Sequence, residues 1–82
     1  MTIEKKVGKC KFIWMAPLLA KYVKVIRSMQ QMRELQIISV YVQLNKMRED
    51  LHDELLEIAE VTREDKEFDH ILSKYVMDML NM

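Results

Sequence analysis

The sequence predicts a small all-α domain, and three properties of the 82-residue chain favour that fold class. Half of the residues are hydrophobic, which is enough for a core and argues against disorder. The chain has one glycine and one proline, which disfavours turn-rich β-sandwiches and glycine-rich phosphate-binding loops. Eight methionines, with many Leu, Glu, Lys and Gln residues, favour helices. We therefore expect a single domain over residues 1–82 with about three helices, completed by self-association.

The first 14 residues are predicted to form a basic N-terminal arm. They are rich in lysine and contain the only glycine, Gly8, as is typical of a loosely docked terminus. Cys10, Phe12 and Trp14 alternate with other residues, which is also the pattern of a short strand at 9–14. An α+β fold with such a strand is therefore an alternative to the all-α fold.

A first helix is predicted over residues 17–30. Pro17 suits the first position of a helix, where its missing N–H removes no helical hydrogen bond. The apolar residues that come after Pro17 recur at three- and four-residue spacing: Leu18, Leu19, Tyr22, Val23, Val25, Ile26 and Met29. Lys21, Lys24 and Arg27 follow one another at three-residue steps on the other side, so this helix is amphipathic with a basic face. Ser28 and Gln31 have the spacing of a capping box, which predicts a break near 28–31.

A long central helix is predicted over residues 32–60. Its apolar positions recur at helical spacing without interruption by glycine or proline. These positions are Ile37, Val40, Leu44, Met47, Leu51, Leu55 and Ile58. Within the same stretch, residues 36–44 are rich in β-branched side chains and alternate in polarity, so a strand there is the alternative.

The last helix is predicted over residues 63–80. Thr62 is a suitable N-cap, and acidic residues follow it in the first turn, where they favour the helix dipole. One apolar stripe then runs along the helix through Phe68, Ile71, Leu72, Tyr75 and Met79.

Charge is divided unequally along the chain. Residues 1–33 contain eight basic residues and one acidic residue, whereas residues 34–82 contain five basic and twelve acidic residues. The formal net charge of zero therefore hides a bipolar molecule. This division favours antiparallel self-association or a partner of defined charge.

The polar residues include two kinds of candidate for metal-binding or catalytic chemistry. Glu49 with His52, and Glu67 with His70, each form an E-x-x-H pair of the kind found in di-iron helical bundles. The apolar stripe of the last helix directs His70 away from the core, so the two pairs are not expected to converge. Cys10 lies between two lysines, which favours a reactive thiolate, but an incidental cysteine in the arm is the simpler interpretation. Ser28, Ser39 and Ser73 lack the G-x-S-x-G motif of a nucleophile elbow. We therefore expect no catalytic residue, no metal site and no cofactor.

These observations favour a non-enzymatic regulatory or adaptor protein that acts through helix-mediated protein–protein interaction. The predicted interface, with a partner protein or with a second copy, is Ile37, Val40, Leu44, Met47, Leu51, Leu55 and Ile58. The alternative function is binding to nucleic acid or to an anionic membrane surface through the basic residues 5–33. In that case Lys21, Lys24 and Arg27 would contact phosphate or lipid headgroups. A single cysteine, and an apolar run of only nine residues at 12–20, favour a cytoplasmic location.

Overall fold

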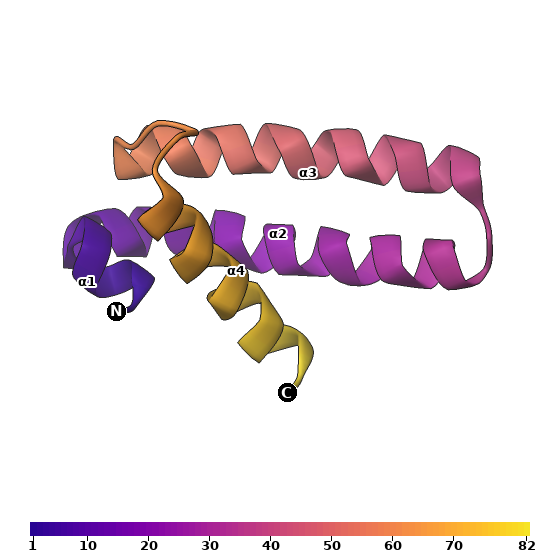
Figure 1. The fold of residues 1–82 in the computed structure, drawn as a ribbon, viewed down its shortest axis with the longest axis horizontal. Coiled ribbons are helices and arrows are strands. Elements are labelled where there is room, and N and C mark those ends of the chain that lie inside the picture. Colours follow the sequence, from indigo (N-terminus) through magenta and orange to yellow (C-terminus); the bar gives the residue numbers. More distant parts are fainter.

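The computed structural model describes all 82 residues, and all of its regular secondary structure is helical. The helices are α1 (Ile3–Val7), α2 (Lys9–Glu34), α3 (Ile38–Ala59) and α4 (Lys66–Leu80). The long helices α2 and α3 lie side by side and antiparallel, joined by a short loop at one end of the molecule (Figure 1). Helix α4 crosses the other end at an angle, next to α1 (Figure 1). The all-α fold class is therefore confirmed.

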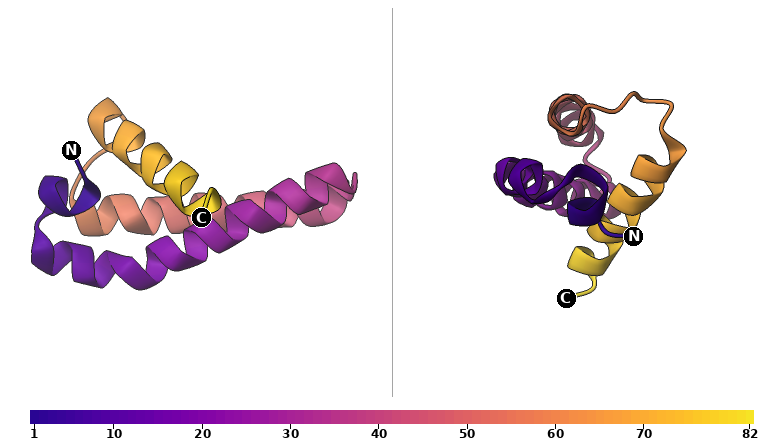
Figure 2. Two further views of the ribbon diagram at one scale, coloured as in Figure 1. Left: turned by 90° about the horizontal axis from the view of Figure 1, so that it is seen from below. Right: turned by 90° about the vertical axis from the view of Figure 1, so that its left-hand side faces the viewer.

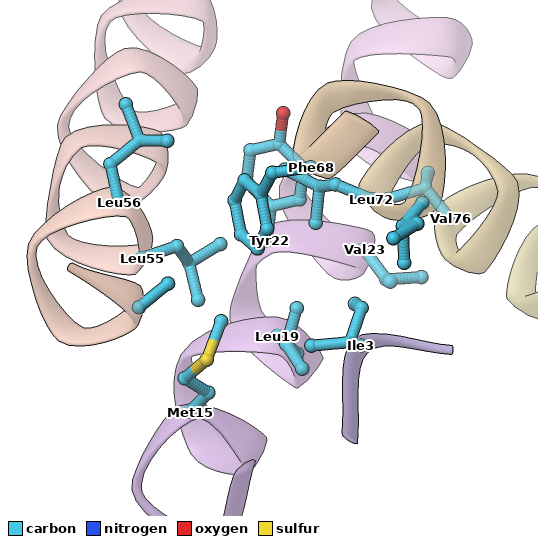
Figure 3. Close-up of a cluster of buried hydrophobic side chains, with 12 residues drawn as sticks. Ile3, Met15, Leu19, Tyr22, Val23, Leu55, Leu56, Phe68, Leu72 and Val76 are labelled. Carbon is cyan, nitrogen blue, oxygen red and sulfur yellow. The ribbon is translucent and has the colours of Figure 1, made fainter. Parts of the chain in front are cut away.

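The hydrophobic core lies where the four helices meet, at the end of the hairpin away from its loop. Figure 3 shows this cluster, to which every helix contributes. Its members are Ile3, Met15, Leu19, Tyr22, Val23, Leu55, Leu56, Ala59, Phe68, Ile71, Leu72 and Val76. No buried polar side chain accompanies them, so hydrophobic burial is what holds α1 and α4 against the hairpin.

The predicted N-terminal arm, 1–14, is helical instead. Thr2 caps α1, its Oγ1 accepting a hydrogen bond from the Lys5 backbone N–H at 3.2 Å, and Ile3 is buried in the core. Gly8 then has φ 94° and ψ 158°, a conformation that glycine adopts without strain, and the chain turns there into α2. Residues 9–14 belong to α2, so the alternative strand at 9–14 is wrong.

Helix α2 begins eight residues before Pro17, where the sequence predicted its start. Pro17 lies inside the helix and has no N–H to donate to the carbonyl four residues earlier, which favours the bend of α2 seen in Figure 2. Met15, on the N-terminal side of Pro17, is completely buried. The free energy gained by burying this side chain offsets the free-energy cost of a proline inside the helix. The helix can therefore extend past Pro17 toward the N-terminus.

The break between the two long helices lies at 35–37, not at 28–31. Ser28 is helical and half-buried, and α2 continues to Glu34, so the predicted helices 17–30 and 32–60 are displaced. Gln36 adopts φ 59°, the left-handed conformation that reverses the chain. The reversal lets the apolar sides of α2 and α3 bury each other. Since α3 begins at Ile38, the alternative strand at 36–44 is also wrong.

Helix α4 agrees most closely with the sequence prediction. Phe68, Ile71 and Leu72 of the predicted stripe are buried in the core. The cap is Asp65 rather than Thr62, because the Asp65 carboxylate accepts a hydrogen bond from the Phe68 backbone N–H at 3.0 Å. The helix consequently begins at Lys66 rather than at residue 63.

Candidate functional site

The loop end of the α2–α3 hairpin projects beyond the core. No residue between positions 30 and 54 is buried, so this half of the hairpin is covered by neither α1 nor α4. Six of the eleven exposed large hydrophobic residues lie in this half, between positions 35 and 47. They are Leu35, Ile37, Ile38, Val40, Val42 and Met47. Such a concentration of exposed apolar surface is characteristic of interaction sites.

One part of this surface, the distal patch, surrounds the α2–α3 loop. We define it as Leu35, Ile37, Ile38, Tyr41 and Val42. A groove of about 470 Å³ lies here, and Ile37, Ile38 and Tyr41 line it together with Met32, Arg33 and Gln36. Ile38 and Val42 are one helical turn apart, so they share a side of α3. Ile38 is 73% exposed and Val42 is 59% exposed, so both are free to contact another molecule.

A second surface, the open face, runs along the side of the hairpin that lies opposite α4. Figure 2 shows α4 on one side of the α2–α3 pair and no helix on the other. A groove of about 570 Å³ lies between the two helices, lined by Lys21, Lys24, Val25, Ser28, Leu44, Met47, Asp50 and Leu51. Four- and three-residue steps from these residues extend the face along both helices. On α2 it comprises Trp14, Leu18, Lys21, Val25, Ser28 and Met32. On α3 it comprises Val40, Leu44, Met47, Leu51, Glu54 and Ile58.

The structure divides the predicted interface residues between core and surface. Ile37, Val40 and Met47 are exposed. Leu44, Leu51 and Ile58 are half-buried along the hairpin. Leu55 is completely buried and packs within the core, so it has no surface to offer a partner. The predicted set is therefore available to a partner in its N-terminal half and contributes to the protein's own packing near Leu55.

The predicted anion contacts are not all on one surface. Lys21 and Lys24 line the same groove and form no ion pair. The Arg27 guanidinium instead donates a hydrogen bond from Nη2 to the backbone carbonyl of Met79, near the end of α4, at 3.3 Å. The structure thus brings two of these three residues to the open face and turns the third toward α4.

Part of the bipolar charge is paired within the chain, which sequence analysis did not locate. Lys6 Nζ lies 3.3 Å from Asp65 and 3.1 Å from Glu67, and Lys11 Nζ lies 3.1 Å from Glu60. Hydrogen bonding to Glu67 and then to Asp65 raises the pKa of Lys6. The hydrogen bond from the Phe68 N–H, followed by that from Lys6, lowers the pKa of Asp65. All of these pairs join the N-terminal part of the chain to the α3–α4 connection and the start of α4.

The two E-x-x-H pairs have separate surroundings. His52 is half-buried, with its ring centroid 6.3 Å from that of Tyr22 and its Nε2 3.7 Å from Asp69. Glu67 pairs with Lys6, and His70 is exposed. No group of three or more His, Cys, Asp or Glu side chains is placed to hold a metal ion. Cys10 is a free, exposed thiol.

The α2 half of the open face was not among the interface residues predicted from the sequence. The signal was present, because Trp14, Leu18, Lys21, Val25, Ser28 and Met32 follow a repeating four-three spacing. Because the helix was predicted to begin at Pro17, Trp14 was left out of this pattern, and the pattern was too short to be recognised as a face.

Comparison of the chain with models of protein families, with curated proteins and with solved structures finds no match. None of the four helices combines the length and apolar character that crossing a bilayer requires.

Proposed function

We propose that this protein is a non-enzymatic regulator or adaptor whose distal patch binds apolar side chains of a partner protein. The observation that carries the proposal is the exposure of Ile38 and Val42 beside a largely apolar groove. Arg33 and Gln36 give this groove a polar edge, the composition of an interaction site with an apolar centre. The free thiol of Cys10 fits action in the reducing cytoplasm.

The lining of the groove supports one mode of partner recognition within this proposal. The groove is lined by Ile37 from the loop, Ile38 from the start of α3 and Met32 from the end of α2. An amphipathic partner helix that inserts two or three apolar side chains fits such a groove. Since nothing of the core reaches this half of the hairpin, binding there requires no rearrangement of the fold.

The proposal is tested by photo-crosslinking in the source cell. A benzoylphenylalanine at Ser39, next to Ile38, should give a discrete partner adduct, whereas the same group at the exposed Ser73 on α4 should not. Ile38→Lys should remove the adduct and leave the far-UV circular dichroism unchanged. Met77→Lys, at a similarly exposed apolar residue of α4, should leave the adduct intact. Equal adducts at Ser39 with and without Ile38→Lys would contradict the proposal.

Binding of nucleic acid or an anionic membrane by residues 5–33 is a second candidate. Its support is that Lys21 and Lys24 carry no ion pair and that Trp14 is 75% exposed. Protein contact is favoured because Lys6, Lys11 and Arg27 are all engaged within the chain, which reduces the charge available for phosphate. Low-salt titration with single- and double-stranded nucleic acid, and with anionic vesicles while following Trp14 fluorescence, tests this candidate. A blue shift or a salt-sensitive complex that Lys21→Glu abolishes would favour it.

A further inference from the structure

We infer that the open face binds a second copy of this chain, giving a twofold dimer in which two hairpins form a four-helix bundle. Both α2–α3 loops lie at the same end of this bundle, and each α2 packs against the α3 of the other copy. The inference uses the open face, whereas the proposed function uses the distal patch around the loop; the two surfaces border each other at Met32, but the residues changed in their tests, Met47 and Ile38, lie on only one of them each. Either can therefore fail without the other.

The open face has the spacing that helix-bundle packing requires. On both α2 and α3 its positions recur at alternating four- and three-residue steps, the pattern that packs helices at small crossing angles. Leu44, Met47 and Leu51 supply apolar groups on α3, and Leu18 and Met32 supply them on α2, whereas Val25 lines the groove but is only 8% exposed. A two-helix layer with such a face is half of a four-helix bundle.

The extent of the open face sets the strength of the dimer. From Trp14 to Met32 the face runs about 27 Å along α2, at 1.5 Å per residue. Two adjacent helices about 10 Å wide then give a projected area of roughly 540 Å². Stable interfaces bury about 800 Å² of accessible surface per partner, so this face falls toward the lower end of the range. We expect a dimer with a dissociation constant in the micromolar range.

Charge selects the relative orientation of the two copies. Helix α2 carries six basic residues and one acidic residue, whereas α3 carries two basic and five acidic residues. Two hairpins packed face to face with their loops at opposite ends would place α2 against α2 and α3 against α3, opposing like charges along both helices. With the loops at the same end, each α2 faces the α3 of the other copy, and neighbouring helices are antiparallel.

Specific side chains support this second arrangement. Lys21 and Lys24 line the central groove at the same level along the hairpin as Asp50 and Leu51. With the loops together, Lys21 and Lys24 of one copy lie opposite Asp50 and Glu54 of the other. Neither lysine has an ion pair within its own chain, and neither acidic residue does, so all four are available for pairing between copies.

Sedimentation equilibrium from about 1 to 100 µM tests whether the dimer forms. We expect a dimer mass at the higher concentrations. Met47→Arg places a charge on the open face and should weaken the dimer at least about tenfold. Met77→Arg, on exposed α4, is the matched control and should have no effect. A monomer mass at every concentration, or equal weakening by both variants, would overturn the inference.

A charge-swap pair tests the contact between α2 and the partner's α3. One chain carries Lys21→Glu and Lys24→Glu, and the other carries Asp50→Lys and Glu54→Lys. Each variant alone opposes like charges and should be monomeric, whereas an equimolar mixture should form a heterodimer. Because all four side chains are at the surface, far-UV circular dichroism should show both variants folded. A folded pair that gives no heterodimer would refute the charge contacts.

The single native cysteine reports the relative orientation without further mutation. Cys10 lies about 13 residues, or about 20 Å, from the middle of the open face along α2. With the loops at the same end, spin labels on the two Cys10 thiols should be about 15–25 Å apart, set by helix spacing and the label arms. With the loops at opposite ends the separation would be about 40 Å. A measured distance near 40 Å would overturn the proposed orientation.

Discussion

Phe68→Ala should remove most of the stability that α4 brings to the fold. Phe68 is completely buried in the cluster that all four helices share (Figure 3). Replacing a buried phenylalanine by alanine costs about 3–5 kcal/mol, because apolar burial is lost and a cavity remains. An 82-residue domain has a total unfolding free energy of about 4–12 kcal/mol. The substitution should therefore remove a large part of the unfolding free energy and lower the melting temperature by at least about 12 °C.

Urea unfolding followed by far-UV circular dichroism measures the effect. Met77→Ala is the control, since it truncates an apolar side chain of the same helix that is 63% exposed, and it should change stability by no more than about 0.5 kcal/mol. Hydrogen exchange should show α2 and α3 amides near the core losing protection together with α4, because they contribute to the same cluster. A loss below about 1 kcal/mol for Phe68→Ala, or equal losses for the two variants, would refute the packing of α4 described above.

Three further substitutions test the backbone and the charges. Gly8→Ala should destabilise by about 1–3 kcal/mol in thermal unfolding, through its positive φ alone, since a Cβ there meets no other atom. D-alanine at position 8, introduced by ligating a synthetic 1–9 segment at Cys10, should be close to neutral, and equal losses for both alanines would contradict this explanation. Gln36→Gly should stabilise by about 0.5–1 kcal/mol by relieving the left-handed φ of 59°, and unchanged stability would show that the loop bears no strain. Asp65→Asn keeps a capping oxygen but removes the charge. Because the fold lowers the pKa of Asp65, its carboxylate stabilises the protein above its usual pKa of 3.8, and this contribution disappears as the pH falls through the lowered value. The stability difference between wild type and Asp65→Asn should thus vanish in acid, and a difference that persists there would contradict the assignment.

The sequence was sufficient for the fold class and for the apolar stripe of α4, because the spacing of apolar residues is a local property. It could not locate the hairpin turn, since the three- and four-residue spacing of apolar residues continues through 35–37 and no glycine or proline interrupts it. The turn depends on Gln36 adopting a conformation that its side chain does not specify. Likewise, Thr62 and Asp65 are both acceptable caps. When Asp65 is the cap, its carboxylate also lies next to Lys6 of α1. This tertiary contact has no signal in the local sequence.

The interface could be predicted only in part for a related reason. Val40, Met47 and Leu55 belong to one periodic pattern, yet Leu55 is buried and Met47 is 52% exposed. Periodicity assigns residues to a side of a helix, but exposure depends on where the other helices pack. Helix α4 has 15 residues and crosses the hairpin at an angle (Figure 1), and on α3 the core cluster that it joins contains Leu55 but not Val40 or Met47. The length and direction of α4 therefore determine which half of the pattern remains at the surface.

The division of charge along the chain has two separate consequences in this fold. At the α1 and α4 end, Lys6 and Lys11 pair with the exposed carboxylates of Glu67 and Glu60, and exposed pairs of this kind add little to stability. On the hairpin, by contrast, a basic α2 and an acidic α3 lie side by side with Lys21, Lys24 and Asp50 unpaired around one groove. Charges arranged in this way discriminate between orientations of an approaching helix more than they stabilise the monomer. The same bipolar sequence thus forms local ion pairs near the N-terminus, and on the open face it leaves the unpaired charges from which we infer the orientation of a second copy.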